Sequence, residues 1–351
     1  MLPFLSKQKL AVGLDIGSHS VKVCEFAEAG KKTKLISLGT AQLPVGAVED
    51  GELRDPETVA EIIKKLIDNL GIKSKKVAIS ISGYSVIMKK INLAVMTEEE
   101  LQHHIQAEAE QYIPFDIDEV YIDFQDLHTN EDDEGRTDVM LVAAKKEVVN
   151  RYIEMLEGIG LKVVVVDVDA FALENAYELC MGQDDNVILV DIGSSKMNIN
   201  IISGGASVFA RDVFLGSRQL TEQIQNNLEI SFEEAEDLKI CAQDAGGQLP
   251  QLEETFSGAC TQWVLEIKKA LDFYNSNYPE QPIDKMVISG GGAHINGLDH
   301  YFANESSLPV ELFNPFVSTM VDAQKIDQEY LSFVAPEMAI SSGLASRKVP
   351  F

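Results

Sequence analysis

One short pattern occurs twice in the chain, and this repeat constrains the fold more than any other feature. Residues 13–20 and 189–195 each contain an apolar segment, an aspartate, an isoleucine, a glycine and one or more serines, and an alternating segment follows each copy. Asp15 and Asp191 lie about half the chain apart, far beyond the roughly 20–50 residues of a solenoid repeat. The repeat therefore predicts two related halves, each with a strand, a tight turn and a second strand.

The two turns carry groups that suit a polyphosphate and its metal ion. Backbone N–H groups of glycine- and serine-rich turns form concavities that bind anions, and a carboxylate beside them can hold Mg²⁺, often through water. Either turn alone is equally typical of an ordinary hairpin, but two such turns favour a phosphate site. Lys22 is either a phosphate-binding cation or a solvated strand lysine. The candidate residues are Asp15, Gly17, Ser18, Ser20 and Lys22 in the first turn, and Asp191, Gly193, Ser194 and Ser195 in the second.

A third element of the same kind lies near the C-terminus. Gly290, Gly291 and Gly292 directly follow an apolar strand, and three glycines permit positive φ angles and the close approach of a flat ligand. The alternative is a flexible connection between a strand and a helix. The chain has no GxxxxGKS/T motif and no GxGxxG directly after its first strand, which argues against a P-loop and a dinucleotide fold.

The composition is that of a soluble globular protein, with 45% apolar and 24% charged residues. The formal net charge of −27 argues against binding to nucleic acid or directly to an anionic membrane. The four cysteines have no metal-binding spacing and indicate free thiols in a reducing compartment. Because no signal peptide or run of about 18–20 apolar residues is recognisable, we expect a cytoplasmic protein that reaches a membrane only through a partner.

The predicted elements alternate between strands and helices, which indicates an α/β fold. A strand meander at 10–41, a helix that opens at Asp55-Pro56 and a strand at 76–82 are followed by a β-α-β-β-α-β order, which predicts a small ferredoxin-like insert. An acidic hairpin turn is predicted at 130–135. The expected divisions are 1–83 for the N-terminal part of the first lobe, 84–166 for the insert, 167–186 for a connecting helix, 187–333 for the second lobe, and 334–351 for a helix that packs back on the first lobe.

The two Asp-x-Gly turns and the Gly-Gly-Gly loop together resemble the actin–Hsp70–sugar-kinase ATPase superfamily over nearly the whole chain. The resemblance implies two lobes built from duplicated ribonuclease-H-like domains, and the insert resembles the subdomain of FtsA-like proteins. Residues 108–115 with Asp123, residues 187–193 and residues 339–345 are similar to the PilM family of type IV pilus assembly. This family implies an actin-like, ATP-binding scaffold at the cytoplasmic face of the inner membrane. It would bind the N-terminal tail of the membrane protein PilN and couple it to the pilus motor ATPases.

The resemblance also implies site residues. ATP would lie between the two turns, with Mg²⁺ held through water by Asp15 and Asp191, and with Asp169 or Glu174 positioning the attacking water. Asp15, Asp169 and Asp191 are thus the candidate catalytic residues. The remaining nucleotide-binding residues that the family implies are Gly216, Glu236, Lys239, Gly290, Gly291 and Gly292. On sequence alone, Glu236 and Lys239 form an exposed i, i+3 pair on a helix.

The second turn departs from the superfamily's Asp-x-Gly-Gly-Gly-Thr form, because Ser194 and Ser195 replace two glycines. Their Cβ atoms crowd the backbone that would wrap a γ-phosphate. We therefore expect ATP binding with at most weak hydrolysis.

The insert is the expected place for the partner peptide. An extended tail can bind at a sheet edge and in the groove beside it, and an acidic protein suits a tail with basic residues. The candidate groove residues are Ile91, Leu93, Val95, Ile113 and Phe115, whose alternative role is the core of the insert.

Two other functions of the superfamily are weighed against the pilus role, and self-association stays open under each. A small-metabolite kinase is disfavoured by the single Trp263 and by few arginines. An FtsA-like cell-division filament protein is disfavoured because no amphipathic membrane helix follows the closing helix.

Overall fold

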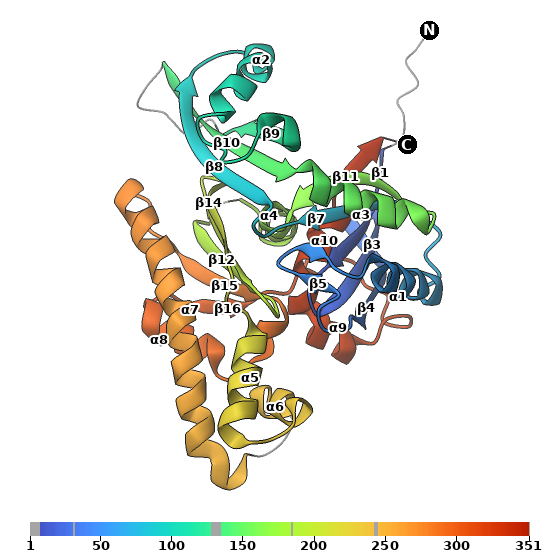
Figure 1. The fold of residues 1–351 in the computed structure, drawn as a ribbon, viewed down its shortest axis with the longest axis vertical. Helices are drawn as coiled ribbons and strands as arrows, with labels where there is room; N and C mark the ends of the chain where they lie inside the picture. The colour runs from blue at the N-terminus through green and yellow to red at the C-terminus, as the bar shows by residue number, and fades with distance from the viewer. Residues whose placement is uncertain (1–7, 31, 128–134, 184, 242–244, 351) are drawn as a thin grey trace.

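The computed structural model describes residues 8–30, 32–127, 135–183, 185–241 and 245–350, and two five-stranded sheets form its two lobes (Figure 1). The strands of the first sheet are β2 (Val12–Ile16), β3 (Ser20–Ala29), β4 (Lys32–Gln42), β7 (Lys76–Ile81) and β11 (Lys162–Val168). Their order is β11-β7-β2-β3-β4. The central strand β2 runs antiparallel to β3 and parallel to β7, so Asp15 lies near the end of a fully paired strand.

The second sheet repeats this arrangement. Its strands are β12 (Val187–Ile192), β13 (Met197–Ser203), β14 (Ala206–Val213), β15 (Lys285–Ser289) and β16 (Val310–Leu312). In the order β14-β13-β12-β15-β16, β12 again has one antiparallel neighbour, β13, and one parallel neighbour, β15. The halves predicted from the repeated turn therefore share one strand plan, and the predicted α/β fold is confirmed.

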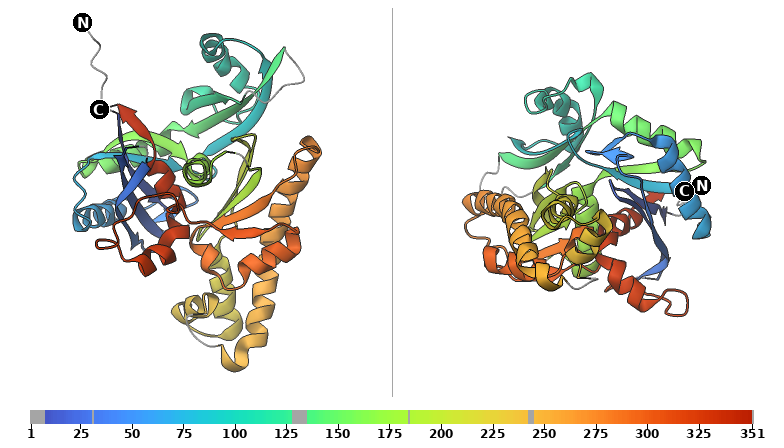
Figure 2. Two further views of the ribbon diagram at one scale, coloured as in Figure 1. Left: turned by 180° about the vertical axis from the view of Figure 1, so that it is seen from behind. Right: turned by 60° about the horizontal axis from the view of Figure 1, so that its bottom comes forward.

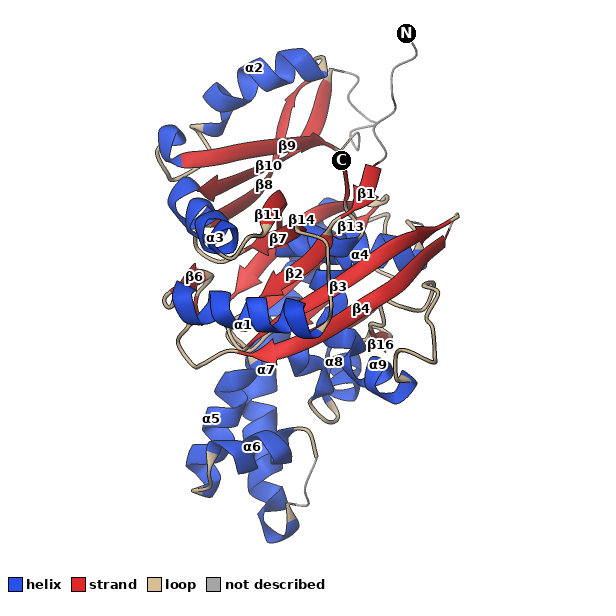
Figure 3. Ribbon diagram, turned by 90° about the vertical axis from the view of Figure 1, so that its right-hand side faces the viewer, coloured by secondary structure: helices blue, strands red, loops and turns tan. Residues whose placement is uncertain are grey.

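Helices cover both sheets. α1 (Pro56–Asn69) lies on one face of the first sheet (Figure 3), where Ile63 is fully buried. It begins where the sequence predicts, because Asp55 Oδ1 accepts a hydrogen bond from the Thr58 backbone N–H at 3.1 Å. The helices of the second lobe are α5 (Ser217–Leu228), α6 (Phe232–Lys239), α7 (Leu249–Asn277) and α8 (Leu298–Ser306). α7 buries Trp263 in the core of this lobe.

The insert differs from the prediction in how its last elements pair. Its sheet has three antiparallel strands in the order β8-β10-β9, and the chain order β-α-β-β-α-β is as predicted. The elements are β8 (Val86–Ala94), α2 (Glu98–Ala109), η1 (Ile117–Glu119), β9 (Val120–Asp126), β10 (Arg136–Lys145) and α3 (Lys146–Gly158). However, β11 pairs with β7 of the first sheet, and α3 buries Tyr152 and Leu156 in the first lobe's core. The ferredoxin-like arrangement is therefore wrong in its last two elements.

The insert with α2 projects from one end of the molecule, and α5, α6 and the long α7 project from the other (Figure 2). The acidic turn predicted at 130–135 lies almost wholly outside the described residues. Within the described ranges, none of the helices combines the length and the apolar character that a membrane span needs.

Two helices pack together at the junction of the lobes. They are α4 (Asp169–Met181) and α10 (Ala339–Ala345), and α10 also packs on β2. A Cβ on Gly343 would lie 1.7 Å from the Ala172 carbonyl oxygen, and a Cβ on Gly13 would lie 1.9 Å from the Ser341 oxygen. Glycine at both positions therefore permits the close contact. The predicted closing helix 334–347 is interrupted, because α9 (Gln328–Val334) and η4 (Ala335–Met338) precede α10. The exact domain boundaries stay a prediction.

The remaining elements are short. β1 (Gln8–Leu10) pairs with β17 (Lys348–Pro350), and β5 (Val48–Glu49) pairs with β6 (Glu52–Leu53). The 3₁₀ turns η2 (Gly246–Gln248) and η3 (Gly291–His294) complete the described chain.

Candidate functional site

The two repeated turns have the same geometry and border one cavity. The Gly17 N–H donates to the Ser20 carbonyl oxygen at 3.1 Å, and the Gly193 N–H donates to the Lys196 carbonyl oxygen at 2.8 Å. Both turns line a cavity of about 410 Å³ between the lobes. The predicted residues that line it are Asp15, Gly17, Ser18, Ser20, Lys22, Asp169, Asp191, Gly193, Ser194, Ser195, Glu236, Lys239 and Gly291.

The first turn presents an ion pair. Lys22 faces Asp15 across the hairpin, and Lys22 Nζ lies 3.1 Å from Asp15 Oδ2. Burial raises the pKa of Asp15, and the Lys22 ammonium opposes this shift. Burial alone would lower the pKa of Lys22, but the charges of Asp15 and Asp191 raise it. Lys22 thus stays protonated between the two aspartates, where its positive charge is available to an anion.

The second turn has an amide where the first has the lysine. Asn198 faces Asp191 across the hairpin, and Asp191 Oδ2 accepts a hydrogen bond from Ser289 Oγ at 2.8 Å. Burial raises the pKa of Asp191 to about 6, opposed by the Ser289 hydrogen bond and the Lys22 charge. Asn198 Oδ1 is a buried acceptor on the cavity wall that has no hydrogen-bond partner.

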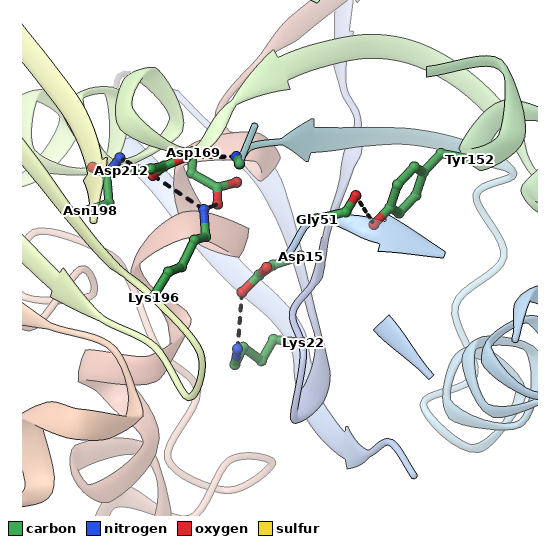
Figure 4. A network of polar contacts seen from close by, with 9 residues as sticks. Asp15, Lys22, Gly51, Tyr152, Asp169, Lys196, Asn198 and Asp212 are labelled. Atoms are coloured by element: carbon green, nitrogen blue, oxygen red, sulfur yellow. Dashed lines mark hydrogen bonds and ion pairs between the residues drawn. The ribbon is translucent and has the colours of Figure 1, made fainter. Parts of the chain in front are cut away.

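Lys196 is a cavity residue that sequence reasoning missed. Its Nζ lies 2.7 Å from Asp169 Oδ2 and 3.3 Å from Asp212 Oδ1 (Figure 4). Burial alone would lower the pKa of Lys196, but Asp169 and Asp212 raise it strongly. The sequence gives one signal for this residue: in the repeat, Lys196 stands where the first turn has Ser20.

The pair expected on a helix surface is instead partly buried. Lys239 Nζ lies 2.8 Å from Glu236 Oε1 and 2.9 Å from Thr221 Oγ1, and only 4% of the Lys239 side chain is exposed. Burial lowers the pKa of Lys239, and Glu236 opposes the shift. The Thr221 hydroxyl in turn donates to Glu236 Oε1. This network fixes Glu236, which is more exposed, at the cavity wall.

The predicted glycines have two different roles. Gly290 has φ +81°, and a Cβ there would lie 2.5 Å from the Ile192 carbonyl oxygen. A Cβ on Gly292 would lie 2.3 Å from Ile192 Cγ2, and one on Gly216 would lie 2.2 Å from the Ser194 carbonyl oxygen. These three glycines pack against the second turn and its strand, and they do not line the cavity. Gly291 alone of the predicted glycine loop borders it.

The opposite rim is aromatic. His294 follows the glycine loop, and its ring stacks on Phe333 of α9 with centroids 4.7 Å apart and an interplanar angle of 17°. His294 Nε2 lies 3.4 Å from Glu337 Oε1, beyond a short hydrogen bond. Tyr330 also borders the cavity. No motif in the sequence indicates these residues, because their neighbourhood arises only when α9 folds back across the cleft.

Two sets of predictions are corrected. Glu174 does not line the cavity, because its Oε1 accepts the Ser207 backbone N–H at 3.0 Å on the far side of α4. In the insert, Ile91, Leu93 and Ile113 are core residues with 4%, 6% and 5% exposure, so they cannot line a groove.

The other two predicted groove residues lie differently. Phe115 packs partly on the insert core, with Lys145 Nζ 4.6 Å from its ring centroid. Val95 is 57% exposed.

The described residues contain no group of three or more His, Cys, Asp or Glu side chains placed to hold a metal ion. Asp15 and Asp191 therefore do not form a dedicated ligand cage. Magnesium in phosphate sites commonly keeps several waters and takes other ligands from the phosphates, and the carboxylates that border this cavity fit that mode.

The two lobes have the same strand order, and in each lobe a strand that ends in Asp-Ile-Gly reaches the shared cleft. This arrangement defines the actin-like class of α/β proteins. A family model described as type IV pilus assembly protein PilM matches residues 13–349, and the chain belongs to this family. It is thus an actin-like protein of type IV pilus assembly.

Known proteins agree with this assignment. A solved PilM–PilN type IV pilus biogenesis complex superposes with a TM-score of 0.84 and 28% identity, covering 95% of this chain and 97% of that chain. MreB5 of Spiroplasma citri bound to ADP has a TM-score of 0.54 and 13% identity, covering 95% of this chain and 94% of that one, and it shares the fold. Cell division protein FtsA of Bacillus subtilis is 22% identical over 264 residues, which span 67% of this chain and 58% of FtsA.

Proposed function

We propose that this protein is a scaffold whose conformation is stabilised by a bound nucleotide. ATP and Mg²⁺ bind in the cleft, and the N-terminal tail of a PilN-type membrane protein binds beside the insert. The observation that carries the nucleotide part is the pair of equivalent turns on one cavity of about 410 Å³. The similarity to a PilM–PilN complex, at 28% identity over nearly the whole chain, carries the partner part. Through this tail the protein would be recruited to the cytoplasmic face of the inner membrane and coupled to the pilus motor.

The cavity suits a nucleotide in size and chemistry. Its volume falls in the usual range of roughly 300–1,000 Å³ for small-molecule sites. The N–H groups of both turns and the Lys22 ammonium suit phosphates, and the unpartnered buried atom Asn198 Oδ1 suits a ligand or its bound water. The MreB5 structures bound to ADP and AMPPNP support a nucleotide in this fold.

The roles of the cavity residues follow from their positions. Gly17, Ser18, Ser20, Gly193, Ser194 and Ser195 would hold phosphates, and Glu236, Lys239 and Gly291 would border the nucleoside. Asp15 and Asp191 would hold Mg²⁺ through water, and the metal would neutralise phosphate charge. Asp169 is engaged by Lys196 at 2.7 Å and is not free to orient a water molecule. Together with the Cβ atoms of Ser194 and Ser195, this favours binding with slow hydrolysis.

A thermal-shift experiment tests the nucleotide part. Mg²⁺-ATP at 100 times its dissociation constant stabilises the folded state by about 2.7 kcal/mol and raises the unfolding temperature. Lys22→Met removes the cation between the two aspartates and is expected to abolish most of this shift. Lys65→Met is the matched control, because Lys65 is 74% exposed and its ion pair with Glu61 lies on the surface of α1. An unchanged melting temperature of the wild-type protein with Mg²⁺-ATP would contradict nucleotide binding.

The corrected groove for the partner lies between the insert and the first lobe. In the described chain, β11 is one of the two edge strands of the first sheet, and β9 is an edge strand of the insert sheet. α3, which follows the insert sheet in the chain, packs on β11. Val163, Val164 and Val165 are half-buried, and Val166 is 36% exposed.

This arrangement suits an extended peptide. Main-chain hydrogen bonds to a free strand edge give affinity, and apolar side chains beside it give specificity. The formal net charge of −27 favours a tail that carries basic residues.

Calorimetry with a synthetic PilN tail peptide tests the partner part. Val166→Lys places a cation in the proposed groove, and we expect the dissociation constant to rise about tenfold, which corresponds to about 1.4 kcal/mol. The matched control is Val317→Lys, because Val317 is 62% exposed and lies in the turn between β16 and α9, outside β11 and the insert. Equal affinity for the two variants would place the tail elsewhere, and no binding to the wild-type protein would refute the partner itself.

A further inference from the structure

A buried polar network crosses the floor of the cleft. Lys196 Nζ contacts Asp169 Oδ2 at 2.7 Å and Asp212 Oδ1 at 3.3 Å (Figure 4). The Gly83 backbone N–H donates to Asp212 Oδ2 at 2.7 Å. Asn198 Nδ2 donates to Asp212 Oδ1 at 2.9 Å. The side chains of Lys196, Asp169 and Asp212 are 18%, 11% and 9% exposed. We call Gly83, Asp169, Lys196, Asn198 and Asp212 the interlobe network.

The members of the interlobe network come from different parts of the fold. Gly83 follows β7 of the first sheet, and Asp169 begins α4 directly after β11 of the same sheet. Lys196 lies in the turn between β12 and β13, and Asp212 lies on β14 of the second sheet. The Lys196 ammonium therefore joins Asp212 on the edge strand of the second sheet to Asp169 of the first lobe, and the Asp212 carboxylate in turn binds Gly83.

Neighbouring contacts attach the start of the insert at the same place. The ring of Tyr84, next to Gly83, stacks on Phe214 with centroids 3.7 Å apart and an interplanar angle of 10°. Further along β8, Lys90 Nζ contacts Asp138 Oδ2 at 2.9 Å and also donates to the Tyr278 hydroxyl of the second lobe. The strand that opens the insert is thus attached to the second lobe beside the interlobe network.

The charges of the interlobe network depend on Lys196. Asp169 and Asp212 contact the same Nζ, so the two carboxylates lie close together in a buried site. Without the ammonium they would repel each other, and both would be buried charges without a counter-ion, which is strongly unfavourable. The hydrogen bond from Gly83 to Asp212 would then hold together two parts of the molecule that the carboxylates drive apart.

We propose that Lys196 is an internal cation that holds the two lobes and the start of the insert together in the absence of nucleotide and metal. The positive charge that the converging carboxylates need is supplied by the chain itself. The relation of the lobes therefore does not depend on an occupied cleft, and Lys196 acts as a positioning residue for Asp169 and for β8. This inference goes beyond the proposed function and does not rest on it.

Hydrogen exchange of the Gly83 amide tests the proposal, because this amide donates directly to Asp212. The measurement uses the full chain without nucleotide or added Mg²⁺. In Lys196→Met we expect the Gly83 amide to exchange about tenfold faster than in the wild-type protein, together with the amides of neighbouring β8. Lys65→Met is the matched control, because Lys65 is 74% exposed and pairs with Glu61 on the same helix, α1. In this control the Gly83 amide keeps its wild-type exchange rate.

A second comparison keeps the test decisive if Lys196→Met fails to fold. The single variant Asp169→Asn retains the ion pair between Lys196 and Asp212. The double variant Asp169→Asn with Lys196→Met lacks this ion pair, but it leaves only one buried carboxylate, Asp212, without a cation. The Gly83 amide should exchange about tenfold faster in the double variant than in Asp169→Asn. Equal Gly83 exchange rates in either comparison would overturn the proposal. Lys196→Arg keeps the cation and should retain Gly83 protection close to that of the wild-type protein.

Discussion

At the scale of single residues, Glu174 shows how burial can make stability depend on pH. Burial raises the pKa of this carboxyl from 4.5 to about 7, and its hydrogen bond from the Ser207 backbone N–H opposes the shift. The folded state therefore holds the proton over a range in which the unfolded chain has released it. The stabilisation from Glu174 is complete below about pH 4.5 and is lost as the pH rises to about 7, by an amount on the order of 3 kcal/mol.

Glu174→Gln should remove this loss. The amide oxygen still accepts from Ser207, but it does not ionise, so the variant is expected to be more stable than the wild-type protein at pH 8, by up to about 3 kcal/mol. At pH 5 the two should differ much less. Urea unfolding at both pH values measures the difference. Asp191, with its pKa raised to about 6, affects both proteins equally and cancels. A difference in stability that is the same at pH 5 and pH 8 would contradict the assignment.

The residues of the cleft divide into those that sequence could predict and those that it could not. Asp15, Lys22 and Asp191 were predictable because all three belong to the repeated turn, and the partners Asp15 and Lys22 lie only seven positions apart in the sequence. Lys196 lies in the second repeated turn, but its partners lie elsewhere in the chain. Asp169 begins α4, and Asp212 lies on β14. Only the folded chain brings these charges together, so no local pattern reveals the interlobe network.

At the scale of elements, local signals predicted starts and ends better than pairing. Asp55 and the following proline fix the start of α1 through local hydrogen bonding, which the sequence carries in full. β11 was also recognisable as an apolar strand, but its neighbour was not. A strand's neighbour depends on which sheet offers an open edge, and here β7 binds β11 in parallel.

The same error explains the misassigned groove. When β11 is taken as part of the insert sheet, the apolar residues of β8 seem free to form a surface. With β11 in the first sheet, Ile91 and Leu93 instead close the insert core. The exposed edge then belongs to β11 itself.

At the scale of the whole molecule, β11 and the start of α4 connect the proposed groove with the cleft. Val166 is exposed on β11, and Asp169, three residues further along the chain, lines the cleft floor. A small displacement of this segment would affect both the proposed groove and the cleft. Strand β11 is hydrogen-bonded along β7, and α4, which follows it, packs against α10. The two proposed ligands would therefore act on one continuous structural element.

We accordingly expect nucleotide and tail peptide to influence each other's binding. A coupling of roughly 1–3 kcal/mol, or about 5–150-fold in affinity, is usual where two sites bias one element. Calorimetry should give different dissociation constants for the PilN tail peptide with and without saturating Mg²⁺-ATP. Thermodynamic linkage requires the peptide to change the dissociation constant of ATP by the same factor.

Lys196→Met should reduce this coupling, because it frees Asp169 from the interlobe network, whereas exposed Lys65→Met should leave the coupling intact. If both ligands bind but neither affinity depends on the other, β11 and α4 do not transmit a change between the sites. The protein would then be a rigid scaffold, and the nucleotide would stabilise its fold without controlling its partner.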